Sequence, residues 1–186
     1  LRMQPKPEPA MPRPLMPSRQ EEEEPASLSP QDNRFARGRL IHALLENLPD
    51  VAIEHREEVA KSYLARRAAE MDTAQREKII QEVLALLNDD KFAPLFGPDS
   101  RAEQSIVGLS GERLIAGQID RLVLKGDEVW VVDYKTNRPP PDDPSRIPAV
   151  YKKQMDSYKE VLQGVYKDKK VRCFLLWTFT ATIMEV

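Results

Sequence analysis

The sequence predicts an α/β protein with a mixed central sheet, flanking helices and an N-terminal helical segment. Three observations support this fold class. Apolar residues recur at helical spacing between residues 32 and 88. Short runs rich in Val, Ile and Leu then follow from 102 to 136, separated by Gly-containing turns. Finally, a helical pattern at 148–163 precedes the near-continuously apolar run VRCFLLWTF, as a strand buried on both faces requires.

Residues 1–31 are expected to form a disordered linker ahead of a single domain at 32–186. Eight of the 16 prolines lie in the first 30 residues, together with a run of four glutamates at 21–24. Such a composition cannot bury enough apolar surface to order the chain. The missing initiator methionine suggests a piece of a longer protein.

Three helices are predicted before the sheet. The first is capped by Asp32 or Asn33 and runs to about Leu48. The second covers about 50–70, and the third covers about 73–88, where Asp72 and Gln75 have capping-box spacing. The buried positions expected on these helices are Phe35, Ile41, Leu44, Leu45 and Leu48; Val59, Tyr63 and Leu64; and Ile79, Ile80, Val83, Leu84 and Leu87. A short turn or helix is expected to pack Phe92, Leu95 and Phe96 into the core.

Strands are expected at 102–109, 117–125, 128–136 and 170–179, and residues 181–186 can add an edge strand. Strict alternation places Asp133 and Lys135 on one face of their strand and Tyr134 on the other. It also places Asp120 on the same face of its strand as Leu122, and Arg121 on the other face. Asp120 lies on the neighbouring strand of the hairpin and could approach Asp133 across the ladder.

The pattern Asp-x-Lys beside a second carboxylate has a chemical interpretation. Two carboxylates can hold a hard divalent cation such as Mg²⁺, which lowers the pKa of a bound water and screens charge on a phosphate. A lysine beside the cation can orient the water or stabilise developing charge. The alternative is an Asp–Lys pair that only solvates the end of a strand.

Four segments in register resemble the PD-(D/E)XK nucleases in their RecB-like form. They are GRLIHALLE at 38–46, GQIDR at 117–121, DYKT at 133–136 and QMDSY at 154–158. Within that branch, phrases such as RGRLIHALLENLP, FAPLFGPDSRAE and DYKTNRPPP are similar to the C-terminal nuclease domain of AddA-type helicase-nucleases, in the alphaproteobacterial form. The resemblance covers about Arg34 to Val186. It implies a restriction-endonuclease-like core.

The resemblance also implies roles for individual residues. His42, Asp120, Asp133 and the carbonyl of Tyr134 would hold the metal. Lys135 would prepare the attacking water, and Gln154 and Tyr158 would face the site from one side of a helix. Two of these assignments have plain alternatives. From its pattern alone His42 could be an ordinary helix histidine, and Glu103 could be either a further ligand or an exposed strand charge.

Contacts to DNA are expected from Arg138, Lys152 and Lys153, although Arg138 could equally be a solvated loop residue. The formal net charge is −2, and the part after residue 33 is neutral. Only the segment from Tyr134 onward is basic, with ten basic and six acidic residues. This modest excess would not by itself suggest nucleic acid.

The implied activity is that of a Mg²⁺-dependent deoxyribonuclease of exonuclease type, with Mn²⁺ as a substitute metal. It would cut single-stranded DNA produced by unwinding during double-strand break repair and recombination. ATP would be used only in the helicase part of a full-length chain, and an AddB-like subunit would be the partner. The alternatives are a non-catalytic nuclease-fold module that holds DNA or docks the AddB-like subunit, and a hydrolase of another phosphodiester.

Composition excludes several other classes. Cys173 is the only cysteine, so the chain can form neither an internal disulfide nor a cysteine-built metal or iron–sulfur site. This sequence therefore departs from the RecB-like nucleases that carry a four-cysteine cluster. No apolar run reaches the length of a membrane span, and there is no signal-peptide pattern. The expected compartment is the cytoplasm.

Overall fold

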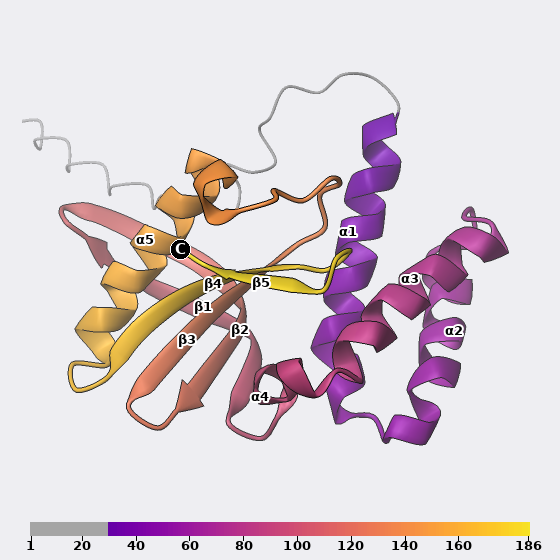
Figure 1. The fold of residues 1–186 in the computed structure, drawn as a ribbon, viewed down its shortest axis with the longest axis horizontal. Coiled ribbons are helices and arrows are strands. Elements are labelled where there is room, and N and C mark those ends of the chain that lie inside the picture. Colours follow the sequence, from indigo (N-terminus) through magenta and orange to yellow (C-terminus); the bar gives the residue numbers. More distant parts are fainter. Residues whose placement is uncertain (1–29) are drawn as a thin grey trace, which may run out of the picture.

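The computed structural model describes residues 30–186, which form a mixed five-stranded sheet between two helical layers (Figure 1). The strands lie side by side in chain order as β1 (Ser100–Ser110), β2 (Arg113–Lys125), β3 (Glu128–Lys135), β4 (Lys170–Trp177) and β5 (Thr182–Glu185). All neighbours are antiparallel except β3 and β4, which are parallel. The predicted fold class and the predicted edge strand are both confirmed.

Helices cover both faces of the sheet. One face packs against α1 (Pro30–Asn47), α2 (Arg56–Arg67), α3 (Thr73–Leu87) and the short α4 (Ala93–Phe96). The other face packs against α5 (Ala149–Val165), the crossover between the parallel strands β3 and β4. Short 3-10 turns lie at Leu48–Asp50, Ile53–His55, Asp90–Phe92 and Pro144–Arg146. The predicted linker lies outside the described residues, apart from its last two positions, which open α1.

Each face of the sheet has its own hydrophobic core. Val132 and Tyr134 of β3 enter the core under α1–α4, whereas Val131 enters the core under α5. The same alternation holds in β4, where Phe174 faces α1–α4 and Cys173 faces α5. β3 and β4 are both covered on both faces, and each contains an apolar run, at 129–132 and at 173–177.

The helical segment agrees with the prediction at its third helix and differs from it at the first two. The capping box of Asp72 and Gln75 is present and starts α3 as expected. The second helix, however, begins only at Arg56, because two 3-10 turns occupy the residues before it. Val59 is therefore 41% exposed, and Ala60 takes its place in the core beside Leu64. Also, α1 begins at Pro30, ahead of the predicted caps, and Phe35 on its projecting first half is exposed (Figure 1).

Candidate metal and catalytic site

The site forms where the regular side-chain alternation of β1 and β2 breaks down. Ile119 and Leu122 both enter the core under α5, so Asp120 and Arg121 between them both face α1. In β1 the ladder skips Glu103, whose φ is +48°. Strict alternation therefore predicted the orientation of Arg121 relative to Asp120 wrongly. The paired irregularity turns two neighbouring carboxylates toward the same helix.

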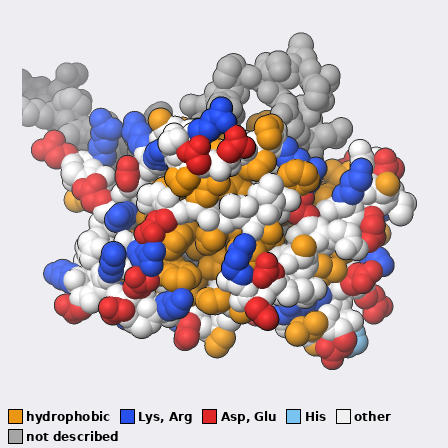
Figure 2. Space-filling view, in the orientation of Figure 1, with side chains coloured by type: hydrophobic (Ala, Val, Ile, Leu, Met, Phe, Trp, Pro, Cys, Tyr) orange, Lys and Arg blue, Asp and Glu red, His pale blue; other side chains and the backbone are white. Residues whose placement is uncertain are grey.

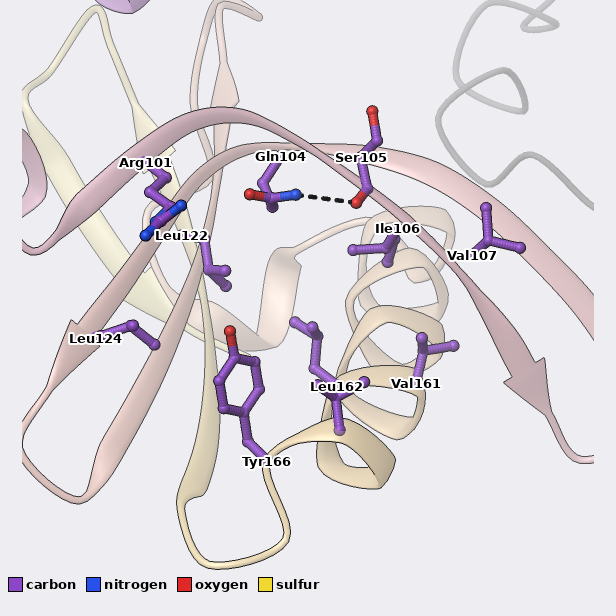
Figure 3. Close-up of a pocket in the computed structure, with 11 residues that line it drawn as sticks. Arg101, Gln104, Ser105, Ile106, Val107, Leu122, Leu124, Val161, Leu162 and Tyr166 are labelled. Carbon is purple, nitrogen blue, oxygen red and sulfur yellow. Dashed lines mark hydrogen bonds between the residues drawn. The ribbon is translucent and has the colours of Figure 1, made fainter.

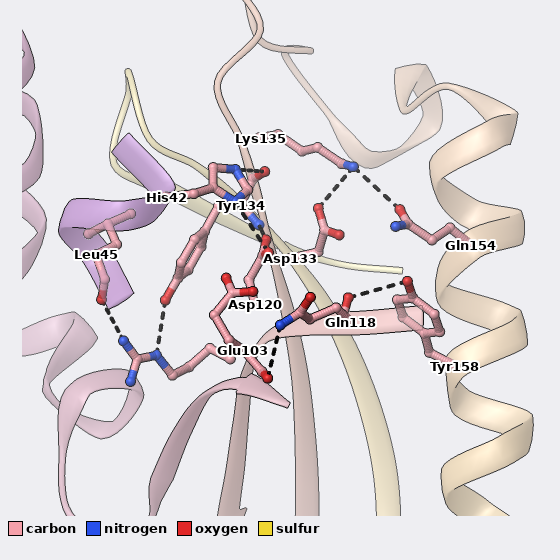
Figure 4. A network of polar contacts seen from close by, with 11 residues as sticks. His42, Leu45, Glu103, Gln118, Asp120, Asp133, Tyr134, Lys135, Gln154 and Tyr158 are labelled. Carbon is pink, nitrogen blue, oxygen red and sulfur yellow. Dashed lines mark hydrogen bonds and ion pairs between the residues drawn. The ribbon is translucent and has the colours of Figure 1, made fainter. Parts of the chain in front are cut away.

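His42 on α1 meets these carboxylates, as Figure 4 shows. Its Nδ1 lies 3.2 Å from Oδ1 of Asp120, and its Nε2 lies 3.1 Å from the carbonyl oxygen of Tyr134. The other carboxylate oxygen of Asp120 accepts a hydrogen bond of 2.6 Å from the backbone N–H of Tyr134. One donor atom each from His42, Glu103 and Asp120 lie within 4.8 Å of one another, and this is the only such group in the described part of the chain.

The three groups lie close enough to shift one another's pKa. Burial lowers the pKa of His42, but the carboxylates of Asp120 and, less strongly, Asp133 more than offset it, and the pKa rises to about 9. Burial raises the pKa of Asp120, yet the imidazole and the Tyr134 N–H outweigh this and hold it below its usual range. The pKa of Glu103 is raised by burial and by the Asp120 carboxylate. A mixed nitrogen and carboxylate donor set whose negative charges lie this close fits a divalent cation.

Lys135 is buried on the opposite side of β3 from His42. Its Nζ lies 2.9 Å from Oδ2 of Asp133, 3.4 Å from Oε1 of Gln154 and 3.9 Å from the centre of the Tyr151 ring. The residue is only 2% exposed. The predicted placement of Asp133 and Lys135 on one face, and of Gln154 beside them, is therefore what the structure shows. Tyr151 was not anticipated, although it lies one turn before Gln154 on α5.

Asp133 and Asp120 are engaged separately. Asp133 pairs with Lys135, and Asp120 pairs with His42. The Asp133 carboxylate still contributes to raising the pKa of His42, so it lies within electrostatic range of the three-donor group. Its role as a shared metal ligand stays a prediction.

Tyr158 braces the strand that leads into the site. Its hydroxyl donates to the carbonyl oxygen of Gln118 at 3.3 Å, and the Gln118 side chain donates to the carbonyl oxygen of Glu103 at 3.2 Å. The ring lies directly over Gly117, where an added Cβ would come within 2.7 Å of the tyrosine oxygen. The glycine of the GQID motif thus allows α5 to approach β2.

Two residues that sequence reasoning missed attach α1 to the sheet. Arg121, 5% exposed, donates to the carbonyl oxygen of Leu45 at 2.5 Å and to the hydroxyl of Tyr134 at 3.1 Å. Gly38 lies so close to β3 that a Cβ there would be 2.9 Å from Oγ1 of Thr136. The signal for both was present in the motifs GRLIH and GQIDR, but only as residues beside the expected ligands.

The residues predicted to touch DNA lie on two segments, the loop after β3 and the start of α5. Arg138 follows β3 and pairs with Glu82 of α3 at 2.6 Å, a contact that the sequence did not suggest. Lys152 and Lys153 lie near the start of α5, one partly buried and the other exposed. On the face shown in Figure 2, basic and acidic side chains are interspersed rather than gathered into one basic patch.

An apolar recess lies away from this chemistry. A cavity of about 420 Å³ opens between β1, β2 and α5 (Figure 3). Its lining includes Ile106, Leu122, Leu162 and Tyr166, with Arg101 as its charged residue. Its lining contains neither carboxylates nor histidine, so the candidate site lies instead around Asp120 in β2 and Lys135 at the end of β3.

Fold and site together define an α/β protein in which His42, Glu103 and Asp120 bring the donor atoms of a metal site together on one side of β3, with a buried lysine on the other. A scan against protein-family models matches residues 18–182 to the PD-(D/E)XK nuclease superfamily, and the chain belongs to that superfamily. Nuclease chemistry that depends on a divalent metal is the activity this membership suggests.

Other comparisons add little. No curated protein matches the sequence. Among solved structures, the crystal structure of SSO0001 matches at 13% identity with a TM-score of 0.36, over 78% of this chain. The alignment spans 65% of that chain. No helix in residues 30–186 has the length and apolar character needed to cross a membrane.

Proposed function

We propose that this chain is a divalent-metal-dependent DNA nuclease that hydrolyses phosphodiester bonds of single-stranded DNA. The observation that supports this best is the placement of Lys135. A lysine only 2% exposed is held by Asp133, Gln154 and Tyr151 at the end of the strand that passes the His42–Glu103–Asp120 group. A solvated strand end would need none of these contacts.

The metal-binding residues in this proposal are His42, Asp120 and Glu103, with Asp133 and the Tyr134 carbonyl completing the set. Mg²⁺ is the expected ion, and the imidazole donor makes Mn²⁺ an effective substitute. When bound, such an ion polarises a phosphate oxygen and lowers the pKa of a coordinated water. The proposal counts Glu103 among the principal ligands because its carboxylate oxygen lies within 4.8 Å of the donor atoms of His42 and Asp120.

The chain's own groups supply position and charge. Asp133 and Gln154 fix the Lys135 ammonium, so it needs little reorganisation to orient a water or to stabilise charge on the phosphate. Tyr158 and Gln118 hold the backbone of β1 and β2 at the level where the regular pairing of the two strands is broken by Glu103 and Asp120. Arg138, Lys152 and Lys153 are the proposed contacts to DNA phosphates.

We further infer that the chain is a domain of an AddA-type helicase-nuclease in the RecB-like branch. The support is the sequence resemblance of the segments at 38–46, 117–121, 133–136 and 154–158. The single cysteine also agrees with it, because a four-cysteine iron–sulfur cluster cannot form within this sequence. In that setting the substrate is the strand released by unwinding at double-strand breaks in the cytoplasm. The cleavage is exonucleolytic, the partner is an AddB-like subunit, and ATP acts at the helicase domains of the same full-length chain.

The test is incubation of the 186-residue protein with end-labelled single-stranded DNA in the presence of chelator, Mg²⁺ or Mn²⁺. Cleavage with either metal, none with chelator, and none in a Lys135→Met variant would support the proposal. Binding of DNA without cleavage under all conditions would instead favour the non-catalytic holding module. Metal-dependent cleavage that persists in Lys135→Met would rule out the assigned site.

A further inference from the structure

Glu82 joins three segments beside the candidate site. Its carboxylate on α3, with the side chain only 6% exposed, accepts hydrogen bonds from Arg37 of α1 and from Arg138 after β3, the latter at 2.6 Å. It also accepts a bond of 2.5 Å from the hydroxyl of Thr178, which follows β4. A buried carboxylate with three donors from three elements fixes all of them in place.

The group has more positive than negative charge. Two guanidinium groups share one carboxylate oxygen, and no second carboxylate within residues 35–186 is ion-paired with either of them. Burial and the neighbouring Arg138 charge both lower the pKa of Arg37, as expected for cations pressed together. One positive charge is therefore left over, and a further anion would be attracted to it.

The surplus charge is accessible and faces solvent through Arg138. The Arg138 side chain is 39% exposed, against 18% for Arg37. Its guanidinium stacks on Phe179 at 3.9 Å from the ring centre, so its plane is held by the aromatic face as well as by Glu82. A guanidinium fixed in this way loses little freedom when it binds a planar or tetrahedral oxyanion.

The group adjoins the strand end that carries the lysine. Arg37 Nη1 reaches the carbonyl oxygen of Thr136 at 3.5 Å, and the backbone N–H of Thr178 donates to the carbonyl oxygen of Lys135 at 3.0 Å. An anion at the arginine pair would therefore sit next to the reacting phosphate along a nucleic-acid strand. Consecutive phosphates in a strand offer that kind of ligand.

We propose that Arg37 and Arg138, organised by Glu82, bind the phosphodiester that neighbours the scissile one on single-stranded DNA. This inference rests on the proposed function and deepens it, because it adds Arg37 to the DNA contacts and assigns Glu82 as a positioning residue. The guanidinium fork is suited to a phosphate in a way that an ammonium group is not.

The experiment measures binding of a labelled oligothymidylate in chelator, where cleavage cannot occur, over a series of salt concentrations. Arg138→Met and Arg37→Met should each weaken binding about tenfold at low salt. Each should also reduce the slope of log affinity against log salt by roughly 0.7. Arg138→Lys should keep the slope, because the charge remains, while losing part of the affinity. Inorganic phosphate at millimolar concentration should compete poorly, because it lacks the neighbouring contacts of a strand.

The matched control is Arg172→Met. Arg172 is also an arginine paired with carboxylates, at 3.2 Å from Glu128 and 2.6 Å from Glu185, but it lies toward the other end of β4 from the lysine. Its loss should leave the slope unchanged. If both arginine variants kept the wild-type slope and only their melting temperatures fell, the proposal would be refuted. Glu82, Arg37 and Arg138 would then serve only to hold α1, α3 and the loop after β3 together. Wild-type protein that neither binds nor cleaves DNA would instead refute the proposed function itself.

Discussion

Four ionisable side chains at the site form two ion pairs in the metal-free protein. His42 faces Asp120, and Lys135 faces Asp133, so each buried charge has a partner of opposite sign. Removing one member leaves the other buried without compensation, which costs more than the pair itself contributes. A substitution at a single residue should therefore change stability as well as chemistry, and the two effects need separate measurements.

Lys135→Met should abolish cleavage while leaving metal binding intact. Methionine keeps the buried chain over Tyr151 but removes the charge, and the lysine acts on water and phosphate rather than on the ion. Loss of such a positioned group should lower the rate on the order of 10²-fold or more. Single-turnover rates with labelled DNA give the effect, and a calorimetric Mn²⁺ titration checks the ion. A variant with near-normal rates would exclude Lys135 from the reaction.

Asp120→Asn should destabilise the metal-free protein. If Asp120 were an unpaired carboxylate close to another, removing its charge would relieve repulsion and stabilise the protein. In the structure, however, Asp120 is paired with His42 and accepts a hydrogen bond from the N–H of Tyr134. Losing a charge-assisted bond in this partly buried position should cost about 1–3 kcal/mol. Urea unfolding in chelator measures this cost, and an equal or higher midpoint in the variant would show that Asp120 is strained rather than satisfied.

At the scale of elements, close approach of helix and strand decides where the site groups lie. α5 reaches β2 over Gly117, and α1 reaches the end of β3 over Gly38. The first contact involves the fully buried ring of Tyr158, which cannot move aside. The close backbone approach at these two glycines sets the distances between the side chains of the site that these helices and strands carry.

Gly117→Ala should destabilise the protein by about 1–3 kcal/mol, because the added methyl group would lie 2.7 Å from the hydroxyl oxygen and 2.8 Å from Cε1 of Tyr158. Gly164→Ala is the matched control. It lies in α5 with no atom within 4 Å of the added Cβ, so it should stabilise by roughly 0.5–1 kcal/mol through helix propensity. Denaturant midpoints of the two variants should move in opposite directions, and a shift of the same sign in both would contradict the packing argument.

At the scale of the whole molecule, the sheet is the one element that both hydrophobic cores share. The helical layer α1–α4 contributes His42, and the strands contribute the carboxylates, so a bound cation would link that layer to the sheet. Because the unfolded chain has no such preformed group, metal binding should stabilise the folded state by mass action.

Mn²⁺ or Mg²⁺ at about 100 times its dissociation constant should stabilise the protein by about 2.7 kcal/mol. For a domain of this size the melting temperature should then rise by roughly 5–10 °C. His42→Ala should reduce the rise sharply, because it removes the ligand that α1 supplies. Melts with chelator and with excess metal give both shifts. The assignment of His42 would not survive equal shifts in the two proteins.

The sequence by itself determined the fold class and the order of its elements. Periodicity and turn residues predicted all five strands and α5, because these depend on local alternation and on apolar content that each segment carries alone. Local spacing also placed Asp133 with Lys135, and Gln154 with Tyr158. Those pairs lie two residues apart on a strand and four apart on a helix, where geometry follows from position in the chain.

Tertiary structure alone decided which residues meet across elements. Glu103 and Asp120 turn toward α1 because both strands lose their alternation at the same level, and no local pattern announces such a break. Glu82 and Arg37 are separated by 45 residues, and they meet Arg138 only because α1, α3 and the end of β3 converge. Their contacts depend on how helices pack on the sheet. Packing is a property of complementary surfaces brought together by the whole chain, and no single stretch of sequence contains it.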